Sequence, residues 1–336
     1  MTREEQYHMR RQGRPSTTYG PVLSWRLGRS LGIDVVPRPK TCTFDCVYCQ
    51  LGRTVRKVAA PTEPRVSTED VLADVRTALQ HLDVRSVDYV TLSGSGEPTL
   101  HPELGSIIEG LRDLVNKPIA VLTNSSLVSN EEVRKGLAMA DLVVAKLDAP
   151  NQPLLEAINR PARGVLHGRI VEGLAMLRGE TRGELALQMM FLGFREGGRG
   201  NTGEETVEAL VRLVGEIKPD EVQINTPTRP PSEGYVVTLK PDEINAIAGK
   251  FRLSTRYARV VSRYDKKLWA APKRLDHERV EEEIVGLVQR RPCSCADIAT
   301  VLNLPTDVVK NHLHELMKQD RLSVVRYEGE DYYKAS

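Results

Sequence analysis

The most informative stretch of this sequence is Lys40-Thr41-Cys42-Thr43-Phe44-Asp45-Cys46-Val47-Tyr48-Cys49-Gln50. Three of the chain's five cysteines lie within eight residues there, spaced C-x3-C-x2-C. Thiolates so close together can all face one inorganic centre, and three of them leave open the position that a fourth ligand fills in a closed structural site. The spacing therefore predicts a metal centre with an open position, held by Cys42, Cys46 and Cys49.

The spacing alone leaves two kinds of centre open. Structural zinc takes four protein ligands, and the remaining pair, Cys293 and Cys295, lies far along the chain. An iron–sulfur cubane is held by cysteine thiolates, and three of them would leave one iron free for a substrate or a cofactor. We favour the cluster, and a zinc knuckle or three unrelated buried thiols is the alternative.

Apolar strands alternate with amphipathic helices after the cysteines. Strands are expected at residues 31–36, 87–92, 119–123, 142–147, 185–194 and 221–226. Helices are expected between them, with capping patterns at residues 67–70 and 129–132. About six such units predict an α/β fold with a parallel sheet, a partial (β/α)6 TIM-like barrel, since eight units would close the barrel. The glycine-containing segment 19–32 is interpreted as tight turns leading into the first strand.

Two motifs together resemble those of radical S-adenosylmethionine (SAM) enzymes. Cys42, Cys46 and Cys49 match the cluster motif of that superfamily, with Tyr48 as the aromatic residue before the third cysteine. The run Ser95-Gly96-Glu97-Pro98, after the second expected strand, matches its Gly-Gly-Glu motif with one glycine replaced by serine. The resemblance extends over residues 19–260 and implies one [4Fe-4S] cluster on the three cysteines.

The resemblance also implies a mechanism. In this superfamily SAM chelates the open iron through its amino and carboxylate groups. One electron from the reduced cluster cleaves the sulfonium and gives a 5′-deoxyadenosyl radical, which abstracts hydrogen from a substrate. Such an enzyme needs an electron donor, which we expect to be of the flavodoxin or ferredoxin type.

Polar residues at the expected strand ends are candidates to hold SAM, because the chemistry of such sheets lies at the carboxyl ends of the strands. Glu97 and the backbone of Gly94, Ser95 and Gly96 offer oxygen atoms to a cationic amino group, and glycine permits close approach of a ligand. Candidates for the ribose and carboxylate are Asn124, Lys146 and Asp148. The alternative for each is a group that caps a neighbouring helix, and for Gln188 and Gln223 we favour that alternative.

A wider pattern resembles a subgroup of iron–sulfur oxidoreductases related to the tRNA wyosine synthase. It comprises residues 19–21, 26–32, 46–52 and 223–227. Wyosine synthase carries a second cluster on additional cysteines, whereas no cysteine here precedes Cys42 or lies between Cys49 and Cys293. We therefore expect a single cluster, and the resemblance gives the cofactor without the substrate.

The last part of the chain changes character. Helices are expected at residues 278–289, 294–302 and 306–317, with Thr306 as a cap, and a hairpin at residues 322–334. This order predicts a small winged helix-turn-helix domain. Residues 276–336 carry eight basic and twelve acidic residues, which argues against DNA binding because phosphate neutralisation dominates nucleic-acid affinity. We expect Cys293 and Cys295 to be small core residues.

Composition and hydropathy limit the possible partners and the location of the protein. The 336 residues carry 47 basic and 45 acidic side chains, so net charge favours neither a nucleic-acid nor a membrane partner. No apolar run approaches the roughly 20 residues of a transmembrane helix, and the polar N-terminus lacks a signal peptide, so we expect a cytoplasmic protein. The expected domains are a polar extension (1–18), the radical SAM domain (19–264), a linker (265–275) and the winged-helix domain (276–336).

Three hypotheses for function follow. The first is a radical SAM enzyme that abstracts hydrogen from an unidentified small molecule, peptide, protein or RNA. The second is a radical SAM enzyme that transfers a methyl or aminocarboxypropyl group. The third is a regulator that uses a cluster as a switch and the winged helix to read nucleic acid. For the winged helix we consider a lid or dimerisation role, docking of a peptide at a strand edge, and RNA binding through the basic linker.

Overall fold

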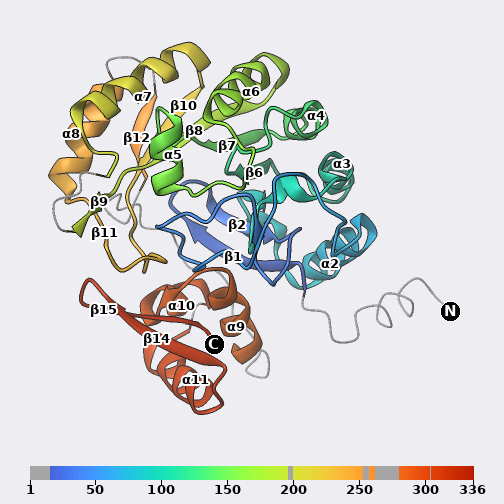
Figure 1. Cartoon of the computed structure of the whole chain (residues 1–336). Helices are drawn as coiled ribbons and strands as arrows, with labels where there is room; N and C mark the ends of the chain where they lie inside the picture. Colours follow the sequence, from blue (N-terminus) through green and yellow to red (C-terminus); the bar gives the residue numbers. More distant parts are fainter. Residues whose placement is uncertain (1–15, 196–199, 253–256, 262–279, 303) are drawn as a thin grey trace.

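The computed structural model describes residues 16–195, 200–252, 257–261, 280–302 and 304–336 (Figure 1). Residues 1–15 of the predicted N-terminal extension and the whole predicted linker, residues 265–275, lie outside the described residues. At the start of the described part, Thr17 is buried, and its backbone and hydroxyl both donate to the carboxylate of Asp74. The first described residues therefore already belong to the main sheet domain.

One eight-stranded sheet forms the main part of the protein, in the order β1-β2-β5-β6-β7-β8-β10-β12. Its strands are β1 (Thr18–Ser24), β2 (Gly28–Ile33), β5 (Tyr89–Leu92), β6 (Ile119–Thr123), β7 (Leu142–Lys146), β8 (Glu184–Met190), β10 (Glu221–Asn225) and β12 (Ala258–Val260). Strand β1 is antiparallel to β2, and all the other neighbouring pairs are parallel. The prediction of an α/β fold with a large parallel sheet is confirmed.

Two short strand pairs accompany the large sheet. Strand β3 (Thr41–Cys42) pairs in parallel with β4 (Arg56–Lys57) and carries the first cysteine. Strand β9 (Gly193–Phe194) pairs with β11 (Val236–Val237) in antiparallel fashion. The expected strand 185–194 is therefore interrupted after Met190, and its last residues belong to this second pair.

Helices cover the outer side of the sheet, as Figure 1 shows. They are α2 (Thr68–His81), α3 (Leu104–Leu114), α4 (Glu131–Ala138), α6 (His167–Glu180), α7 (Glu204–Ile217) and α8 (Pro241–Arg252), while the short α5 (Gln152–Ile158) follows β7. The predicted caps are confirmed at Ser67, which accepts from Asp70, and at Asn130, which accepts from Glu132 and Val133. Apolar side chains of the helices and of alternate strand residues share one large core.

The opposite side of the sheet, called here the inner face, has a different composition. Its apolar residues form a second, smaller cluster, which comprises Leu27, Ala120, Leu142, Val144 and Ala186 with Tyr89 and Leu122 packed against them. Polar pairs occupy other positions on it, such as the hydroxyls of Ser30 and Thr91, 2.5 Å apart. A sheet buried on both sides by apolar packing shows continuous apolar strands, and the polar positions of the inner face depart from that pattern.

The interpretation of residues 19–32 as turns is wrong. These residues form most of β1 and β2, which pair with a bulge between Tyr19 and Val22. The glycines serve strand packing: a Cβ atom on Gly32 would lie 2.1 Å from the ring of Tyr19. The expected first strand, 31–36, correspondingly ends at Ile33. Glycine in a strand marks a bulge or a close approach as readily as a turn.

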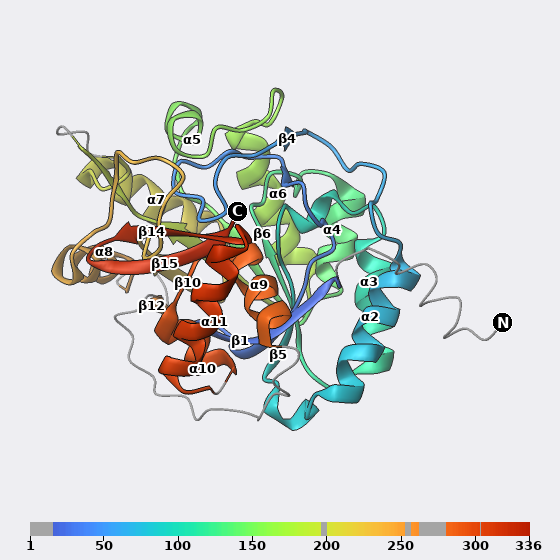
Figure 2. The same ribbon diagram turned by 90° about the horizontal axis from the view of Figure 1, so that it is seen from below.

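A C-terminal unit packs beside β1 (Figures 1 and 2). It comprises α9 (Val280–Arg290), β13 (Cys293–Ser294), α10 (Cys295–Leu302), α11 (Thr306–Lys318), β14 (Leu322–Tyr327) and β15 (Glu330–Ala335), with its strands in the order β13-β15-β14. Its hydrophobic cluster includes the buried Cys293 and is joined by Val22 of β1. The N-cap of α11 is Pro305, whereas the sequence suggested Thr306.

No helix among the described residues is both long enough and apolar enough to cross a membrane.

Two glycines of α6 give a matched test of this packing. A Cβ atom on Gly173 would lie 2.7 Å from the backbone of Val128 and Ser129, whereas one on Gly179 meets nothing within 4 Å. We expect Gly173→Ala to destabilise the protein by roughly 1–3 kcal/mol, because backbone atoms cannot easily move aside. Gly179→Ala should stabilise it by about 0.5–1 kcal/mol through helix propensity. Urea unfolding measures both, and equal effects of the two changes would contradict the packing described.

Candidate metal centre

The cysteine loop lies across the carboxyl ends of the parallel strands. It follows β2 and is held by backbone hydrogen bonds from several segments. Val47 donates to the carbonyl of Ile158 at the end of α5, and the amide of Glu97, after β5, donates to the carbonyl of Thr41. Segments after β2, β5 and β7 therefore meet at the three cysteines, the edge of the sheet where the sequence places the chemistry.

Each of the three cysteine sulfurs accepts a hydrogen bond from nitrogen. The Cys42 sulfur lies 3.4 Å from the amide nitrogen of Asn124 and 3.4 Å from the backbone nitrogen of Phe44. The Cys46 sulfur lies 3.4 Å from the amide nitrogen of Asn159. The Cys49 sulfur lies 3.1 Å from the ammonium of Lys40, which also donates to the carbonyl of Gly52. Donors of this kind stabilise thiolate ligands and tune the centre that they hold.

Without a bound centre, two of the three thiols, Cys42 and Cys46, are held in the neutral form. Burial, with the nearby carboxylate of Glu97, raises the pKa of Cys42 to about 12. Burial, with the neighbouring Cys49, raises the pKa of Cys46 to about 11. All five cysteines are free of disulfide bonds. Since thiolates and not thiols bind metals, loading of the site must displace these protons.

A single zinc ion and a polynuclear cluster need different arrangements of their donors. Three thiolates on one zinc ion lie about 4 Å apart, because each Zn–S bond is about 2.3 Å long. Among the described residues, no group of three His, Cys, Asp or Glu side chains is placed to hold one metal ion. A polynuclear iron–sulfur centre distributes its cysteines over several irons and needs a wider set.

The Gly94–Glu97 loop packs tightly beside the cysteines. The carboxylate of Asp34 accepts from both the amide and the hydroxyl of Ser95, at 3.0 and 2.7 Å. A Cβ atom on Gly94 would collide with Asp34, and one on Gly96 with the carbonyl of Thr41. The glycines thus have a packing role within the protein. The carbonyls of Gly94 and Gly96 accept no hydrogen bond from any described residue, and both residues are partly accessible.

Glu97 is buried, and its carboxylate accepts four hydrogen bonds. One oxygen accepts from the backbone and hydroxyl of Thr99 and from the hydroxyl of Thr123, the other from the backbone of Asn124 at 2.7 Å. Burial raises the pKa of Glu97, and these donors oppose the rise. The carboxylate predicted to meet an amino group therefore joins the end of β5 to the end of β6.

Three other predicted residues also have partners within the protein. The Asn124 amide donates to Thr43 and to the Cys42 sulfur. Asp148 accepts from Tyr48 and from Asn159 on one oxygen, and from the backbone of Met190 on the other. Burial, followed by the charge of Asp148, raises the pKa of Tyr48 well above its ordinary value.

Lys146 lies between this group and the inner face. Its ammonium is 3.4 Å from the carboxylate of Asp148 and 5.0 Å from the centre of the Tyr48 ring. It also donates to the side chain of Gln188 at 3.5 Å. Of the two glutamines that we assigned to capping, both face inward on neighbouring strands and bond to each other. Neither side chain caps a helix in the described structure.

These contacts continue across the inner face as a row of polar side chains, called here the inner row. It runs from Lys146 through Gln188 and Gln223 to Glu221, which pairs with Arg259 of β12. Each step joins neighbouring strands or neighbouring inward positions of one strand. The inner row therefore connects the cysteine end of the sheet with its last strand.

The sequence reasoning missed several residues of this site. Asn159 lies 111 residues beyond Tyr48 and shows no local motif, so only the folded chain brings it to Cys46. Asp34 and Thr123 likewise act through distant partners, Ser95 and Glu97. The sequence did contain a local signal for Lys40. Its ammonium lies two residues before Cys42, and a nearby cation favours the thiolate form of a cysteine.

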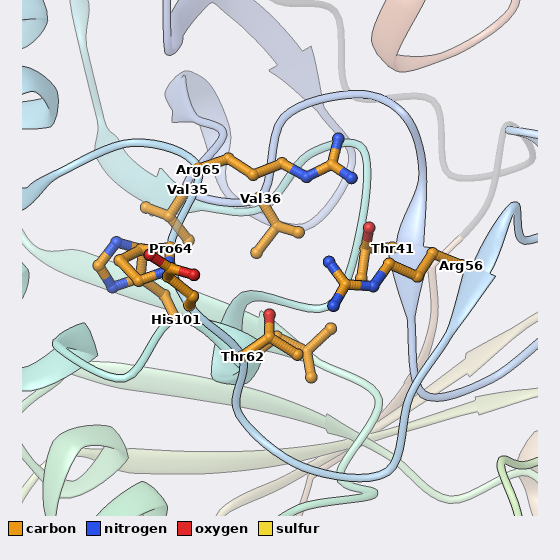
Figure 3. A pocket seen from close by; sticks show the side chains of 10 residues that line it. Val35, Val36, Thr41, Arg56, Thr62, Pro64, Arg65 and His101 are labelled. Atoms are coloured by element: carbon orange, nitrogen blue, oxygen red, sulfur yellow. The ribbon is translucent and has the colours of Figure 1, made fainter.

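A pocket lies beside the cysteine loop (Figure 3). It is lined by Val35, Val36, Thr41, Arg56, Thr62, Glu63, Pro64, Arg65, Leu100 and His101, and has room for little more than a water molecule. The ring of His101 is engaged at both nitrogens, by the carbonyl of Val66 and the amide of Glu103. The pocket is therefore too small for SAM and lacks a free imidazole.

Tyr48 and Tyr235 give a matched test of the hydrogen-bonded group. The Tyr48 hydroxyl bridges the buried Asp148 and Asn159, whereas that of Tyr235, an exposed residue, meets only Arg160 among the described residues. We expect Tyr48→Phe to destabilise the protein by roughly 1–3 kcal/mol, since it deprives a buried carboxylate of a donor. Tyr235→Phe should change stability by less than about 0.5 kcal/mol. Denaturant unfolding measures the stability of both variants. A Tyr48→Phe protein as stable as wild type would refute the bridging role.

Two relatives and one solved structure are similar to this chain. The chain is 33% identical over 318 residues to the UPF0026 protein MJ1312 of Methanocaldococcus jannaschii, covering 94% of each chain. It is 42% identical over 213 residues to the UPF0026 protein slr1464 of a Synechocystis species, covering 63% of this chain and 76% of that one. A radical SAM methyltransferase of Sphaerobacter thermophilus shares the fold, with a TM-score of 0.51 and 18% identity over 69% of this chain and 65% of that chain.

Residues 36–230 match the radical SAM superfamily, which confirms the resemblance drawn from the two motifs. The match spans the cysteine loop, the Gly94–Glu97 loop and the strands from β3 through β10. The chain therefore belongs to the radical SAM superfamily, whose enzymes bind a [4Fe-4S] cluster and S-adenosylmethionine.

Proposed function

We propose that Cys42, Cys46 and Cys49 hold one [4Fe-4S] cluster and that SAM binds at its open iron. The observation that carries this assignment is the nitrogen donor beside each sulfur, from Asn124, Asn159 and Lys40. These donors orient three thiolates at the carboxyl ends of the parallel strands. Hydrogen-bond partners around metal ligands have this role in general.

The residues beside the loop suggest how SAM is held. The carbonyls of Gly94 and Gly96, which accept no hydrogen bond from the described residues, suit a cationic amino group. Glu97 fixes the loop that presents them and adds negative charge nearby. Asn124, Lys146 and Asp148 lie at the adjacent strand ends, and Tyr48 lies in the cysteine loop beside them. These side chains would contact the rest of SAM after giving up some of the bonds that they make to one another.

The protein positions a substrate for radical chemistry. A cluster held by Cys42, Cys46 and Cys49 would supply, when reduced by a flavodoxin- or ferredoxin-type donor, the electron for SAM cleavage and thus the chemistry for hydrogen abstraction from a substrate. The inner row offers amide, carboxylate and cationic groups on the face of the sheet next to that centre. We propose that the substrate lies along this row, inside a partial (β/α)6 barrel of the radical SAM type.

The C-terminal unit has the helix order and hairpin of a winged helix-turn-helix, and we propose that it acts as a cover for the barrel. Helices α9 and α10 contact β1, at the edge of the sheet. Residues 276–336 carry an acidic excess, which disfavours a nucleic-acid reader. We retain a relation to the wyosine synthase subgroup only for the cofactor chemistry.

Cysteine substitutions test the proposal. After anaerobic reconstitution we expect about four irons per wild-type chain and, with SAM and a reductant, formation of 5′-deoxyadenosine. Cys42→Ala, Cys46→Ala and Cys49→Ala should lose both iron and SAM cleavage, because each removes one of three ligands. Cys295→Ser, in the C-terminal unit, is the matched control and should keep both. Zinc in place of iron, or iron retained by all three alanine variants, would refute the assignment.

The products of SAM also separate the two enzymatic hypotheses. Mass spectrometry of the reduced reaction distinguishes 5′-deoxyadenosine from products of methyl or aminocarboxypropyl transfer.

Lys40 gives an independent prediction about the electronic state of the cluster. Its ammonium lies 3.1 Å from the Cys49 sulfur and should stabilise the more negative, reduced state. We expect Lys40→Met to lower the midpoint potential by on the order of 65–130 mV, since a hydrogen bond to a charged group contributes about 1.5–3 kcal/mol and 59 mV is a tenfold change for one electron.

Two controls sharpen this test. Lys57→Met removes an exposed ammonium that donates to the carbonyl of Arg160, and it should leave the potential unchanged. Lys40→Arg keeps the positive charge and should restore most of the difference. Redox titration followed by electron paramagnetic resonance measures the potentials, and equal values for Lys40→Met and wild type would exclude the role of Lys40.

A further inference from the structure

Four arginines converge between the first and last strands of the large sheet. Arg26 lies in the turn between β1 and β2, Arg259 on β12, Arg229 in the segment after β10, and Arg291 just after α9. The pKa of Arg26 is lowered to about 10, first by burial and then by the positive charges of Arg229, Arg291 and Arg259. Elements from both ends of the sheet and from the C-terminal unit thus bring like charges together.

Three of these arginines are fixed by contacts with the protein. Arg259 pairs with Glu221 at the end of the inner row. Arg229 lies 3.5 Å from the carboxylate of Asp297, donates to the carbonyl of Pro292 and stacks 5.1 Å from the centre of the Trp25 ring.

Arg291 donates to the carbonyl of Leu23 at 3.3 Å. Burial lowers the pKa of Arg291, but Cys293 and Asp297 raise it, and the net direction is upward.

Arg26 is different, because its guanidinium makes no hydrogen bond or ion pair with any described residue. Its Nε atom is buried and has no partner. A buried cation without a partner is costly, and native proteins usually supply one. Among the described residues, ion pairs join these four guanidinium groups to two carboxylates, Glu221 and Asp297, so after these pairs the cluster keeps an excess of two positive charges.

The unpartnered guanidinium is also within reach of the inner face. The side chain of Arg259 donates to the carbonyl of Arg26 at 3.4 Å, and Arg26 is partly accessible. The inner row connects Arg259 with Lys146 across three strand spacings, which amounts to about 15 Å. A molecule of moderate size lying along the row would thus reach both the cysteine centre and the arginines.

We infer that Arg26, Arg229, Arg259 and Arg291 bind a phosphoryl group at the far end of the substrate. The inference rests on the proposed function, since it assigns a substrate class to that same site. Guanidinium groups match phosphate oxygens in geometry, and a phosphate monoester near pH 7 carries close to the two negative charges that the cluster lacks.

The cover over the cluster favours a small phosphorylated molecule. Besides the contacts of Arg229 and Arg291, the hydroxyl of Tyr332 in the C-terminal unit lies 3.3 Å from the carbonyl of Thr228. These bonds close the C-terminal unit over the arginines. A terminal phosphate can enter along the inner face, whereas an RNA backbone would have to thread beneath the cover.

The test measures anion binding to the full-length, anaerobically reconstituted protein, without SAM or reductant. The probes are inorganic phosphate and pyrophosphate, with potassium chloride at matched ionic strength as the reference. At saturating concentrations we expect an upward shift in Tm of about 2–4 °C for the wild type. Arg26→Met should lose this shift, and without anion its Tm should equal or exceed that of wild type, because it removes an unpartnered buried charge.

Two further variants keep the test decisive. Arg85→Met removes an exposed arginine paired with Asp83 and should respond to phosphate as the wild type does. Arg26→Lys keeps the charge but not the planar fork, so it should fold and show a reduced phosphate shift. If Arg26→Met fails to fold, the comparison of Arg26→Lys with wild type decides.

An equal phosphate shift in wild type, Arg26→Met and Arg26→Lys would overturn the assignment. A larger shift with a single-stranded RNA oligonucleotide than with pyrophosphate, at equal phosphate concentration, would overturn the small-molecule class. Neither outcome bears on the cluster, because the iron content and SAM cleavage of the cysteine variants test the proposed function separately.

Discussion

The buried carboxylate of Glu97 is the interaction on which the site depends most. Its four hydrogen bonds lock the end of β5 to the end of β6, and a buried carboxylate is tolerated only when donors surround it. Its backbone amide holds the carbonyl of Thr41, and its side chain fixes the backbone of Asn124, whose amide reaches the Cys42 sulfur. One charge thus sets the position of the first cysteine relative to two strands.

The sequence predicted the ligand set and the strand ends because both are local patterns. The trio Cys42, Cys46 and Cys49 lies within one loop, and apolar runs mark most of the parallel strands. It did not predict Asn159 beside Cys46 or Asp34 beside Ser95, because those contacts join segments that meet only when the sheet forms. The misread glycines of β1 and β2 have the same cause, since their packing against Tyr19 has no local signature.

The C-terminal unit is connected to the site through a short chain of contacts. The Arg290 guanidinium lies 3.8 Å from the Asp34 carboxylate and 4.7 Å from the centre of the Tyr19 ring. Asp34 in turn holds Ser95, and the hydroxyl of Tyr19 lies 2.8 Å from that of Ser93. Burial raises the pKa of Asp34, while Arg290 and then Ser95 oppose the rise. The position of this unit therefore bears directly on the loop proposed to hold SAM.

The contrast between the two sides of the sheet explains how one domain serves both stability and chemistry. The outer side is filled by apolar residues, and their burial stabilises the fold. This side can therefore be packed without regard to a ligand. The inner face instead places Lys146, Gln188 and Gln223 side by side, and removing such polar groups from water costs free energy. A polar face that is only partly satisfied within the protein is unfavourable unless a ligand completes it. The unpartnered Arg26 at the far end of this face is the strongest case, because its charge has no counterpart among the described residues.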